Sequence, residues 1–339
     1  MGTETKVIGG EFSSQDSCRW LHKEGGGEDF KYYFPGNPFF LQTGTDAMAA
    51  SVLSMSRQAS LTTFWAPVHF CNDTLSRFIL KTSPEIRLEI KRYTRLSDLR
   101  ERKSHEIFFF VHFNGYDPEI SAFIEKQKEH HRDFFLEDFV HAPFSMNRRL
   151  SAYSFNCLRK GLPLDVSVAY GNLDSKSFLP GENSEFHKAV KEARDLKSKD
   201  PIRNEKLFLS KFDEGKTALH DPSIYAAPAP YLKDVRNIRW RQIEHKRKEN
   251  YQALSQFFSK HAFCEILRGE SMYFMMRVPE RDRLRAFCRE RMMFFPVHWI
   301  DAKTPLSNEI ISLVIDQRYD LDDMRTTAQT VLEFYGKKV

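Results

Sequence analysis

Two groups able to handle protons end a stretch of sequence that is otherwise built for burial. The segment "FFLEDFVHAPFS", residues 134–145, runs from bulky apolar residues into the carboxylate of Asp138 and the imidazole of His141. A buried carboxylate is costly unless a cation or a protonated ring nitrogen pairs with it. We therefore expect Asp138 to face a positively charged ligand group, with His141 beside it, while Glu137 serves the turn.

A candidate nucleophile lies shortly downstream, in "NCLRKGLPL" at residues 156–164. Lys160 is surrounded in the sequence by Leu158, Leu162 and Leu164. Enclosure among apolar side chains lowers the pKa of an amine and makes it a usable nucleophile. The alternative is an ordinary solvated lysine in a loop, so this prediction depends on Lys160 being enclosed.

An anion site and a flat platform precede these residues in the chain. Gly44, Thr45 and Asp46 open a helix directly after a strand, where backbone N–H groups and the helix dipole favour an anion. The strand "FWAPVHF" delivers His69 and Phe70, either of which could stack on a flat ligand or simply pack. A phosphate cradle, a stacking ring, an acid for a ring nitrogen and an amine are together what pyridoxal phosphate requires.

Strands and helices alternate along the chain in a way that places such groups at one edge of a sheet. This alternation predicts an α/β fold with a largely parallel sheet. Ligands of such sheets bind beyond the carboxyl ends of the strands, which is where the candidate residues fall. The strands are expected at residues 39–44, 61–70, 85–93, 106–113, 134–138 and 165–171, and towards the C-terminus at 272–279 and 294–300.

Shifts in composition divide the chain into three parts. The polar, glycine-rich residues 1–36 are expected to form an N-terminal arm, and residues 37–230 the large ligand-binding domain. Residues 231–339 are expected to form a linking helix and a small C-terminal α/β domain. The basic run at 233–251 is interpreted as one long solvated helix with i,i+4 charge pairs such as Glu244–Lys248. The net charge of +5 is mild for 339 residues and does not by itself suggest nucleic acid.

Cysteine usage and hydropathy indicate an intracellular soluble protein. The five cysteines are scattered without a CxxC pair, which argues for reduced thiols and against a disulfide framework or a zinc site. The first residues lack the apolar core of a secretory signal peptide, and the longest apolar runs are too short to span a bilayer. We expect a cytoplasmic protein that binds small molecules, with no metal, no nucleic acid and no membrane among its partners.

The order of the motifs resembles one enzyme family. From about residue 38 to residue 337 the chain carries "TGTDAM", "APVHFC", "VHFNGYDPEISAFIEK", "FFLEDFVHAPFS", "NCLRKGLP", "FFPVHW" and "SLVIDQRYDLDDM". This order resembles the DegT/DnrJ/EryC1/StrS aminotransferases, and "LEDFVHA" and "SLVIDQRYDLDDM" are the more specific pieces. The resemblance implies a fold-type-I pyridoxal-phosphate (PLP) transferase with a mostly parallel, seven-stranded large domain and a small C-terminal α/β domain. It also implies a homodimer with a composite active site.

The resemblance further implies a role for each candidate residue. Asp138 would pair with the pyridine nitrogen, His141 would contact the ring hydroxyl, and Lys160 would form the Schiff base and shuttle a proton. His69 occupies the stacking position, with Phe70 as the fallback. The residues that would hold the cofactor phosphate are Gly44, Thr45, Asp46 and Cys157, where Cys157 replaces the family's serine unless a shifted alignment uses Ser154.

The expected activity is therefore PLP-dependent amino transfer. An amino acid, glutamate if the family pattern holds, would donate to a keto acceptor such as a nucleotide-linked keto-sugar or a natural-product intermediate. The chain departs from the family around the lysine, where "PLDVSVAYG" replaces a glycine-rich stretch. Two alternatives stay open: another PLP-dependent reaction at an α-carbon (decarboxylation, racemisation or cyclisation), and a non-catalytic protein with the same fold.

Overall fold

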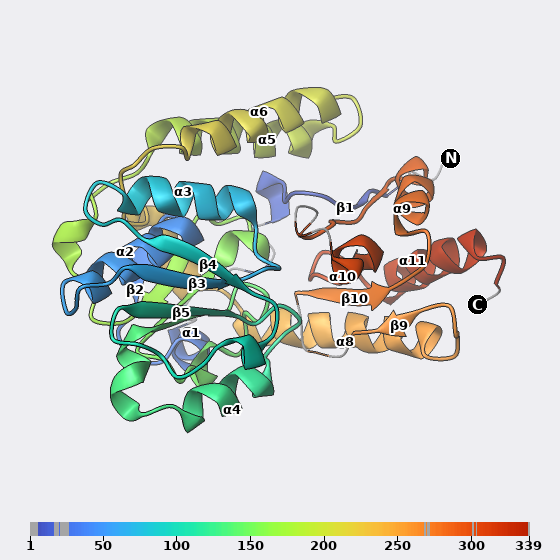
Figure 1. Cartoon of the computed structure of the whole chain (residues 1–339). Helices are drawn as coiled ribbons and strands as arrows, with labels where there is room; N and C mark the ends of the chain where they lie inside the picture. The colour runs from blue at the N-terminus through green and yellow to red at the C-terminus, as the bar shows by residue number, and fades with distance from the viewer. Residues whose placement is uncertain are drawn as a thin grey trace. The chain divides into compact units, whose positions relative to one another are not determined.

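The computed structural model describes residues 6–16, 20, 27–267, 269, 272–299, 302 and 304–337, so Cys18 and much of the expected arm lie outside the described residues. The chain forms two compact units, Phe12–Arg239 and Met1–Glu11 with Trp240–Val339 (Figure 1). The boundary between the two units thus follows Arg239, whereas the sequence predicts a domain boundary after residue 230. Residues 6–11 pack with the C-terminal unit.

A seven-stranded sheet forms the centre of the unit Phe12–Arg239, in the order β2-β8-β7-β6-β5-β3-β4. Strands β3 to β7 pair in parallel, whereas β8 is antiparallel to both of its neighbours. The predicted α/β fold with a largely parallel sheet is confirmed. The strands are β2 (Phe39–Leu41), β3 (Thr63–Pro67), β4 (Glu89–Tyr93), β5 (Glu106–Val111), β6 (Phe135–Asp138), β7 (Tyr153–Cys157) and β8 (Ser167–Tyr170).

Helices cover both faces of this sheet because its central strands are apolar on both sides. In β5 the side chain of Phe109 packs with helices α2 (Gly44–Ser56) and α3 (Asn72–Thr82). Its neighbour Phe110 packs on the opposite face with α4 (Pro118–Lys126). Figure 1 shows α3 and α4 on opposite sides of the sheet. Burying each such side chain stabilises the fold by about 1.5–3 kcal/mol.

Strand β7 was not predicted, although it carries a candidate site residue. Its apolar side chains alternate with polar ones, since Tyr153 and Phe155 face α2 while Ser154 and Asn156 are turned to the other face. All of them are buried, and both polar side chains are completely so. A central strand with two buried polar residues does not show the continuous apolar run by which buried strands are recognised.

A helical hairpin follows β8 in the chain. Helices α5 (Ser184–Lys199) and α6 (Glu205–Ala218) share an apolar cluster that includes Phe186, Val190 and Phe212. A Cβ on Gly215 would lie 2.9 Å from Cγ2 of Val190, so glycine allows the two helices to approach closely.

The remaining elements of this unit are short. They are α1 (Gly27–Tyr33), α7 (Ala229–Arg236), η1 (Ser14–Asp16), η3 (Leu96–Asp98), η4 (Glu129–Phe134), η5 (Met146–Arg148), η6 (Leu158–Lys160) and η7 (Ser175–Ser177).

The C-terminal unit is built on a three-stranded antiparallel sheet in which β10 (Tyr273–Arg277) lies between β12 and β9. The predicted strand at 294–300 is wrong over most of its length. Strand β11 ends at Phe294, shortly before Pro296, which has no N–H to continue a ladder. The other elements are β1 (Ile8–Gly9), α8 (Trp240–Phe258), β9 (Glu265–Ile266), α9 (Arg281–Glu290), β11 (Met293–Phe294), α10 (Pro305–Glu309), β12 (Ile310–Val314) and α11 (Leu321–Phe334).

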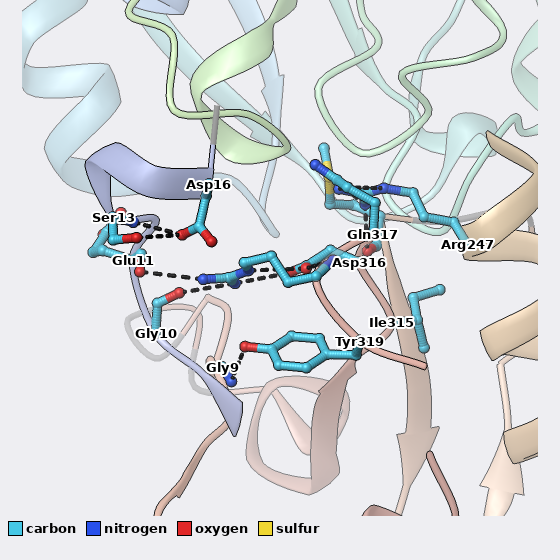
Figure 2. Close-up of polar contacts among 12 residues, drawn as sticks. Gly9, Gly10, Glu11, Ser13, Asp16, Arg247, Ile315, Asp316, Gln317 and Tyr319 are labelled. Atoms are coloured by element: carbon cyan, nitrogen blue, oxygen red, sulfur yellow. Dashed lines mark hydrogen bonds and ion pairs between the residues drawn. The ribbon is translucent and has the colours of Figure 1, made fainter. Parts of the chain in front are cut away.

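The basic run at 233–251 is not one solvated helix. It is divided between α7 and α8, and Arg247 on α8 is 4% exposed. Its Nε and Nη2 donate to Oε1 of Gln317 at 3.1 and 2.8 Å (Figure 2). The predicted surface pair of Glu244 and Lys248 is present at 3.0 Å. None of the described helices is both long enough and apolar enough to cross a membrane.

The first described residues are tied to the C-terminal motif "IDQRYDL". Strand β1 pairs in parallel with β11, and the hydroxyl of Tyr319 accepts the N–H of Gly9 at 2.7 Å (Figure 2). This hydrogen bond is buried. It provides an acceptor for the backbone N–H of Gly9, which the short ladder between β1 and β11 does not satisfy.

Arg318 extends the same connection. Its Nη2 donates to the carbonyl of Gly10 at 3.2 Å and its Nη1 to that of Glu11 at 3.3 Å. Asp316 holds the guanidinium from the other side, at 2.9 Å from Nε and 2.7 Å from Nη2. Burial alone raises the pKa of Asp316, but the charge and hydrogen bonds of Arg318 outweigh burial and leave the pKa below its ordinary value.

Replacing Tyr319 by Phe tests the connection between β1 and the motif. The variant keeps the ring but leaves the N–H of Gly9 buried without an acceptor, which costs about 1–3 kcal/mol. Tyr335→Phe is the matched control, because it removes an exposed hydrogen bond to the carbonyl of Pro279. Urea unfolding should show a clearly larger loss for Tyr319→Phe, and equal losses in the two variants would contradict the assignment.

Candidate functional site

The parallel strands bring the candidate residues to one edge of the large sheet. Strands β5, β6 and β7 run in the same direction, and two antiparallel pairings through β8 give β2 that direction too. Gly44 follows β2 closely, Asp138 ends β6 and Cys157 ends β7. In the pairing register Asp138 lies opposite Val111 on one side and Phe155 on the other.

The start of α2 is rigidly capped. The side chain of Thr43 accepts the N–H of Asp46 at 3.1 Å, and the carboxylate of Asp46 accepts the N–H of Thr43 at 3.0 Å. Lys81 of α3 lies 3.0 Å from the same carboxylate, and both charged side chains are almost fully buried. Asp46 therefore supports the helix end, and its carboxylate is engaged inside the protein instead of being available to a phosphate.

The first backbone N–H groups of α2 meet strand β7. A Cβ on Gly44 would lie 3.1 Å from Cβ of Cys157, so a side chain at this position would crowd the strand. The first N–H groups of a helix have no acceptor within the helix, and Gly44 and Thr45 supply such groups here. Together with the positive end of the helix dipole, these donors favour an anion.

Cys157, and not Ser154, faces this helix end. The two residues point to opposite faces of β7, because side chains alternate along a strand. Ser154 is fully buried on the other face, and its Oγ has no hydrogen-bond partner among the described residues. This geometry favours Cys157 over Ser154 as the residue beside the start of α2.

Asp138 is a buried acid held by one backbone hydrogen bond. It is 5% exposed, and its Oδ1 accepts the N–H of Val140 at 2.7 Å. Burial raises its pKa to about 7, while the hydrogen bond from Val140 and the charge of Lys160 act in the opposite direction. A positively charged partner would stabilise the ionised form of this carboxyl group.

His141 is buried beside the carbonyl of Phe113. Its Nδ1 lies 3.1 Å from that oxygen and must donate, because a carbonyl only accepts. Burial and the charge of Lys160 lower the pKa of His141 to about 4, so its ring is neutral near pH 7. A neutral ring that donates from Nδ1 keeps an acceptor lone pair on Nε2.

Lys160 is placed differently from the expectation. It ends the turn η6 and is exposed, whereas Leu158, Leu162 and Leu164 point into the protein interior and are buried. The leucines anchor the turn and leave the amine outside, so the predicted enclosure is wrong for a single chain. The charge of the Lys160 ammonium group nevertheless contributes to lowering the pKa values of Asp138 and His141.

The two rings after β3 have different environments. Phe70 belongs to the core, with its ring edge-to-face against Phe109 at 4.9 Å between centroids. His69 is half-buried and meets Phe113 edge-to-face at 6.4 Å. Core packing removes Phe70 as the fallback platform and leaves His69.

An arginine that the sequence did not single out holds the His69 turn. Nη2 of Arg92 donates to the carbonyls of Val68 at 3.0 Å and Phe70 at 3.2 Å, one on each side of His69. Burial, and then the charge of Arg92, lower the pKa of His69 and keep its ring neutral. Arg92 lies in the period-two segment 85–93, whose pattern indicates a strand but carries no signal for this contact.

Glu137 lies on the face of β6 opposite to Asp138, where its carboxylate accepts hydrogen bonds from the surrounding protein. Its Oε2 accepts from the N–H groups of Leu150 at 2.9 Å and Ser151 at 2.7 Å, and its Oε1 lies 3.3 Å from Nε2 of His112. Burial raises the pKa of Glu137, but the hydrogen bonds from His112 and Ser151 outweigh burial and lower it. Glu137 thus fixes the segment that leads into β7.

Solved structures with this architecture cover almost the whole chain. DesV from S. venezuelae, solved in complex with a ketimine intermediate, is 13% identical, with a TM-score of 0.60 over 96% of this chain and 93% of that chain. The chain has a fold-type-I aminotransferase fold. A DegT DnrJ EryC1 StrS aminotransferase from Brucella abortus is also 13% identical, with a TM-score of 0.56 over 94% of this chain and 92% of that chain. The sugar aminotransferase CalS13 from Micromonospora echinospora is 12% identical, with a TM-score of 0.57 over 96% of this chain and 98% of that chain.

Comparison by sequence does not find these proteins of similar fold. No family model matches the chain, and no curated protein is similar to it in sequence. The roles of the residues at the sheet edge therefore depend on their own geometry.

The titration of Asp138 predicts how stability changes with pH. The carboxyl group has a pKa of about 7 in the folded protein and 3.8 as its ordinary value. Between these values the folded state binds the proton more tightly, so unfolding becomes easier as pH rises, by up to about 1.4 kcal/mol per pH unit.

Urea unfolding without added cofactor, compared between the wild type and Asp138→Asn, isolates this effect. The free energy of unfolding of the wild type, relative to the variant, should fall from pH 5 to pH 7. A difference that stays constant over this range would show that Asp138 does not titrate as its burial predicts.

Proposed function

We propose that this chain is a PLP-dependent aminotransferase that moves an amino group from an amino acid to a keto acceptor. The observation that carries the proposal is the meeting of three features at one sheet edge. Among the described residues, these features are a helix start whose first N–H groups have no acceptor within the helix, a buried acid with no ion-pair partner, and an exposed lysine whose charge lowers the pKa of that acid.

The residues present fit the cofactor. The N–H groups of Gly44 and Thr45, beside Cys157, would hold its phosphate, and Asp138 would hold its ring nitrogen. A protonated ring nitrogen supplies the positive charge that a buried carboxyl group lacks, and the pair would keep Asp138 ionised at neutral pH. When bound, the cofactor supplies an electron sink for negative charge at the substrate's α-carbon.

Two neutral imidazoles would orient the ring. His69 would stack on its face, held in place by Arg92, and His141 would contact the ring hydroxyl. Neutrality matters for both, because an imidazolium would repel a protonated pyridine ring. The lowered pKa values of His69 and His141 support these roles.

Lys160 would attach the cofactor and then act as the general acid and base. Its amine would take the proton from the substrate's α-carbon and return a proton to C4′ of the cofactor. Asp138 and His141 lie close enough for electrostatic coupling to Lys160, so the charge at the amine and at the ring would be linked.

The acceptor, the donor and the assembly state belong to the same proposal. The names of several structures with this fold describe sugar aminotransferases, which supports a keto-sugar acceptor, and glutamate remains the proposed donor. Exposure of Lys160 in the single chain supports a homodimer in which the second subunit completes the site.

Lys160→Ala should abolish covalent cofactor binding. Wild type incubated with PLP should gain a visible absorbance band, and borohydride reduction should add the cofactor mass to the peptide that contains Lys160. Lys176→Ala, at an exposed lysine of the same unit, is the control and should behave like the wild type. A wild type that binds no added PLP, or attaches it elsewhere, contradicts the proposal.

Addition of amino acids then separates the alternatives. If glutamate removes the visible band and releases 2-oxoglutarate, the reaction is transamination. If glutamate has no effect while another amino acid is decarboxylated, racemised or cyclised, the fold serves different PLP chemistry. A protein that binds PLP but converts no amino acid would be a non-catalytic relative.

Gly44→Ala should weaken cofactor binding specifically. The added methyl group lies 3.1 Å from Cβ of Cys157, and the resulting shift displaces the donors at the start of α2. We expect the dissociation constant for PLP to rise by about tenfold, equivalent to about 1.4 kcal/mol. Ser56→Ala at the other end of α2 is the matched control, and equal affinities in the two variants would exclude this phosphate position.

A further inference from the structure

The turn that carries Lys160 belongs to a hairpin with a firm base. Strands β7 and β8 are antiparallel, with Cys157 opposite Ser167, and the N–H of Leu158 donates to the carbonyl of Val166 at 2.9 Å. Beyond this hydrogen bond the hairpin leaves the sheet. Contacts outside the sheet therefore set the direction in which Lys160 points, and the buried leucines of the turn supply only part of them.

A buried ion pair grips the hairpin from helix α5. Nη1 of Arg194 lies 2.9 Å from Oδ2 of Asp165, and Nη2 lies 3.0 Å from Oδ1, so the pair is bidentate. The Asp165 side chain is 1% exposed and that of Arg194 is 9% exposed. His187 of the same helix approaches Asp165 at 3.9 Å, and burial lowers its pKa, which leaves Arg194 as the main counter-charge.

A second contact reaches the residue next to Lys160. The guanidinium of Arg159 lies over the ring of Phe186, 5.5 Å from its centroid. Phe186 is fully buried in the cluster shared by α5 and α6, so it offers a rigid surface. The turn is thus held by α5 on both sides of Lys160.

A buried ion pair often contributes little to the stability of a fold. The desolvation of the two charges often exceeds their attraction, and apolar residues of similar size are frequently as stabilising. What a bidentate arginine–carboxylate pair provides is a defined direction between two elements. Here the two elements are the lysine hairpin and a helix that lies outside the sheet.

We propose that Asp165 and Arg194 are positioning residues, which orient the hairpin so that the amine of Lys160 faces Asp138 and His141. This inference rests on the proposed function of Lys160. An exposed lysine on a free turn would sample many directions, and catalytic groups need to be held within a fraction of an ångström. The α5–α6 hairpin is then a support of the active site and not only a surface decoration.

Three variants test the proposal. Arg194→Lys keeps the charge but loses the planar fork, and Asp165→Asn keeps the shape but loses the charge. The double variant Asp165→Leu with Arg194→Met removes both charges, so that no lone charge stays buried. Arg203→Ala is the control, because its ion pair with Asp200 is exposed and lies beyond the last residue of α5.

Two measurements distinguish positioning from mere stability. Hydrogen exchange of the cofactor-free protein should become about tenfold faster at residues 158–166 in the variants, with the rest of the unit unchanged. The rate of covalent PLP attachment to Lys160, trapped by borohydride, should fall by about tenfold in the same variants. Urea unfolding reports the stability of each variant separately.

The outcomes are separable. Unchanged exchange at residues 158–166 in folded variants overturns the proposal, and so does a loss of stability with an unchanged attachment rate. If the double variant does not fold, Arg194→Lys decides. If the wild type itself attaches no PLP, the proposed function fails, while the exchange data still decide whether the ion pair orients the hairpin.

Discussion

The common direction of strands β2, β5, β6 and β7 is the constraint on which the rest of this structure depends. Parallel strands end at one edge of the sheet. Residues that are far apart in the sequence therefore meet at this edge. Asp138 and Cys157 are neighbours for this reason. The start of α2 joins them because β2 returns to the same direction through the antiparallel strand β8.

The alternation of side chains along β6 then places two neighbouring carboxylates in different environments. Glu137 and Asp138 are adjacent carboxylates that lie on opposite faces of the sheet. Glu137 lies on the face covered by α4, and Asp138 lies on the face covered by α2, as Cys157 does. Glu137 has hydrogen-bond donors from His112 and from the segment before β7, so its charge is satisfied internally. Asp138 has one backbone donor, and burial raises its pKa to about 7. The number of hydrogen-bond donors around each carboxylate therefore explains why the pKa of Glu137 is lowered and that of Asp138 is raised.

Arginines that touch no proposed reacting atom connect this edge to the surrounding fold. Arg92 binds the carbonyls on both sides of His69, and Arg194 binds the carboxylate that follows the Lys160 turn. In both cases a guanidinium with several donors in one plane holds a loop that has no ladder of its own. Loops at the edge of a sheet need such supports, because the hydrogen bonds of the sheet end where the loops begin.

The sequence by itself determined the α/β architecture, the largely parallel sheet and the identity of Asp138, His141 and Lys160 as the residues to examine, because periodicity and residue chemistry are local properties. The tertiary structure alone decided that Cys157 and not Ser154 faces α2, that Asp46 is engaged with Lys81, and that the leucines around Lys160 turn inward. It also revealed β7, whose buried polar residues hide its pattern. These outcomes depend on which face of a strand meets which helix, and that choice is made by packing between segments distant in the chain.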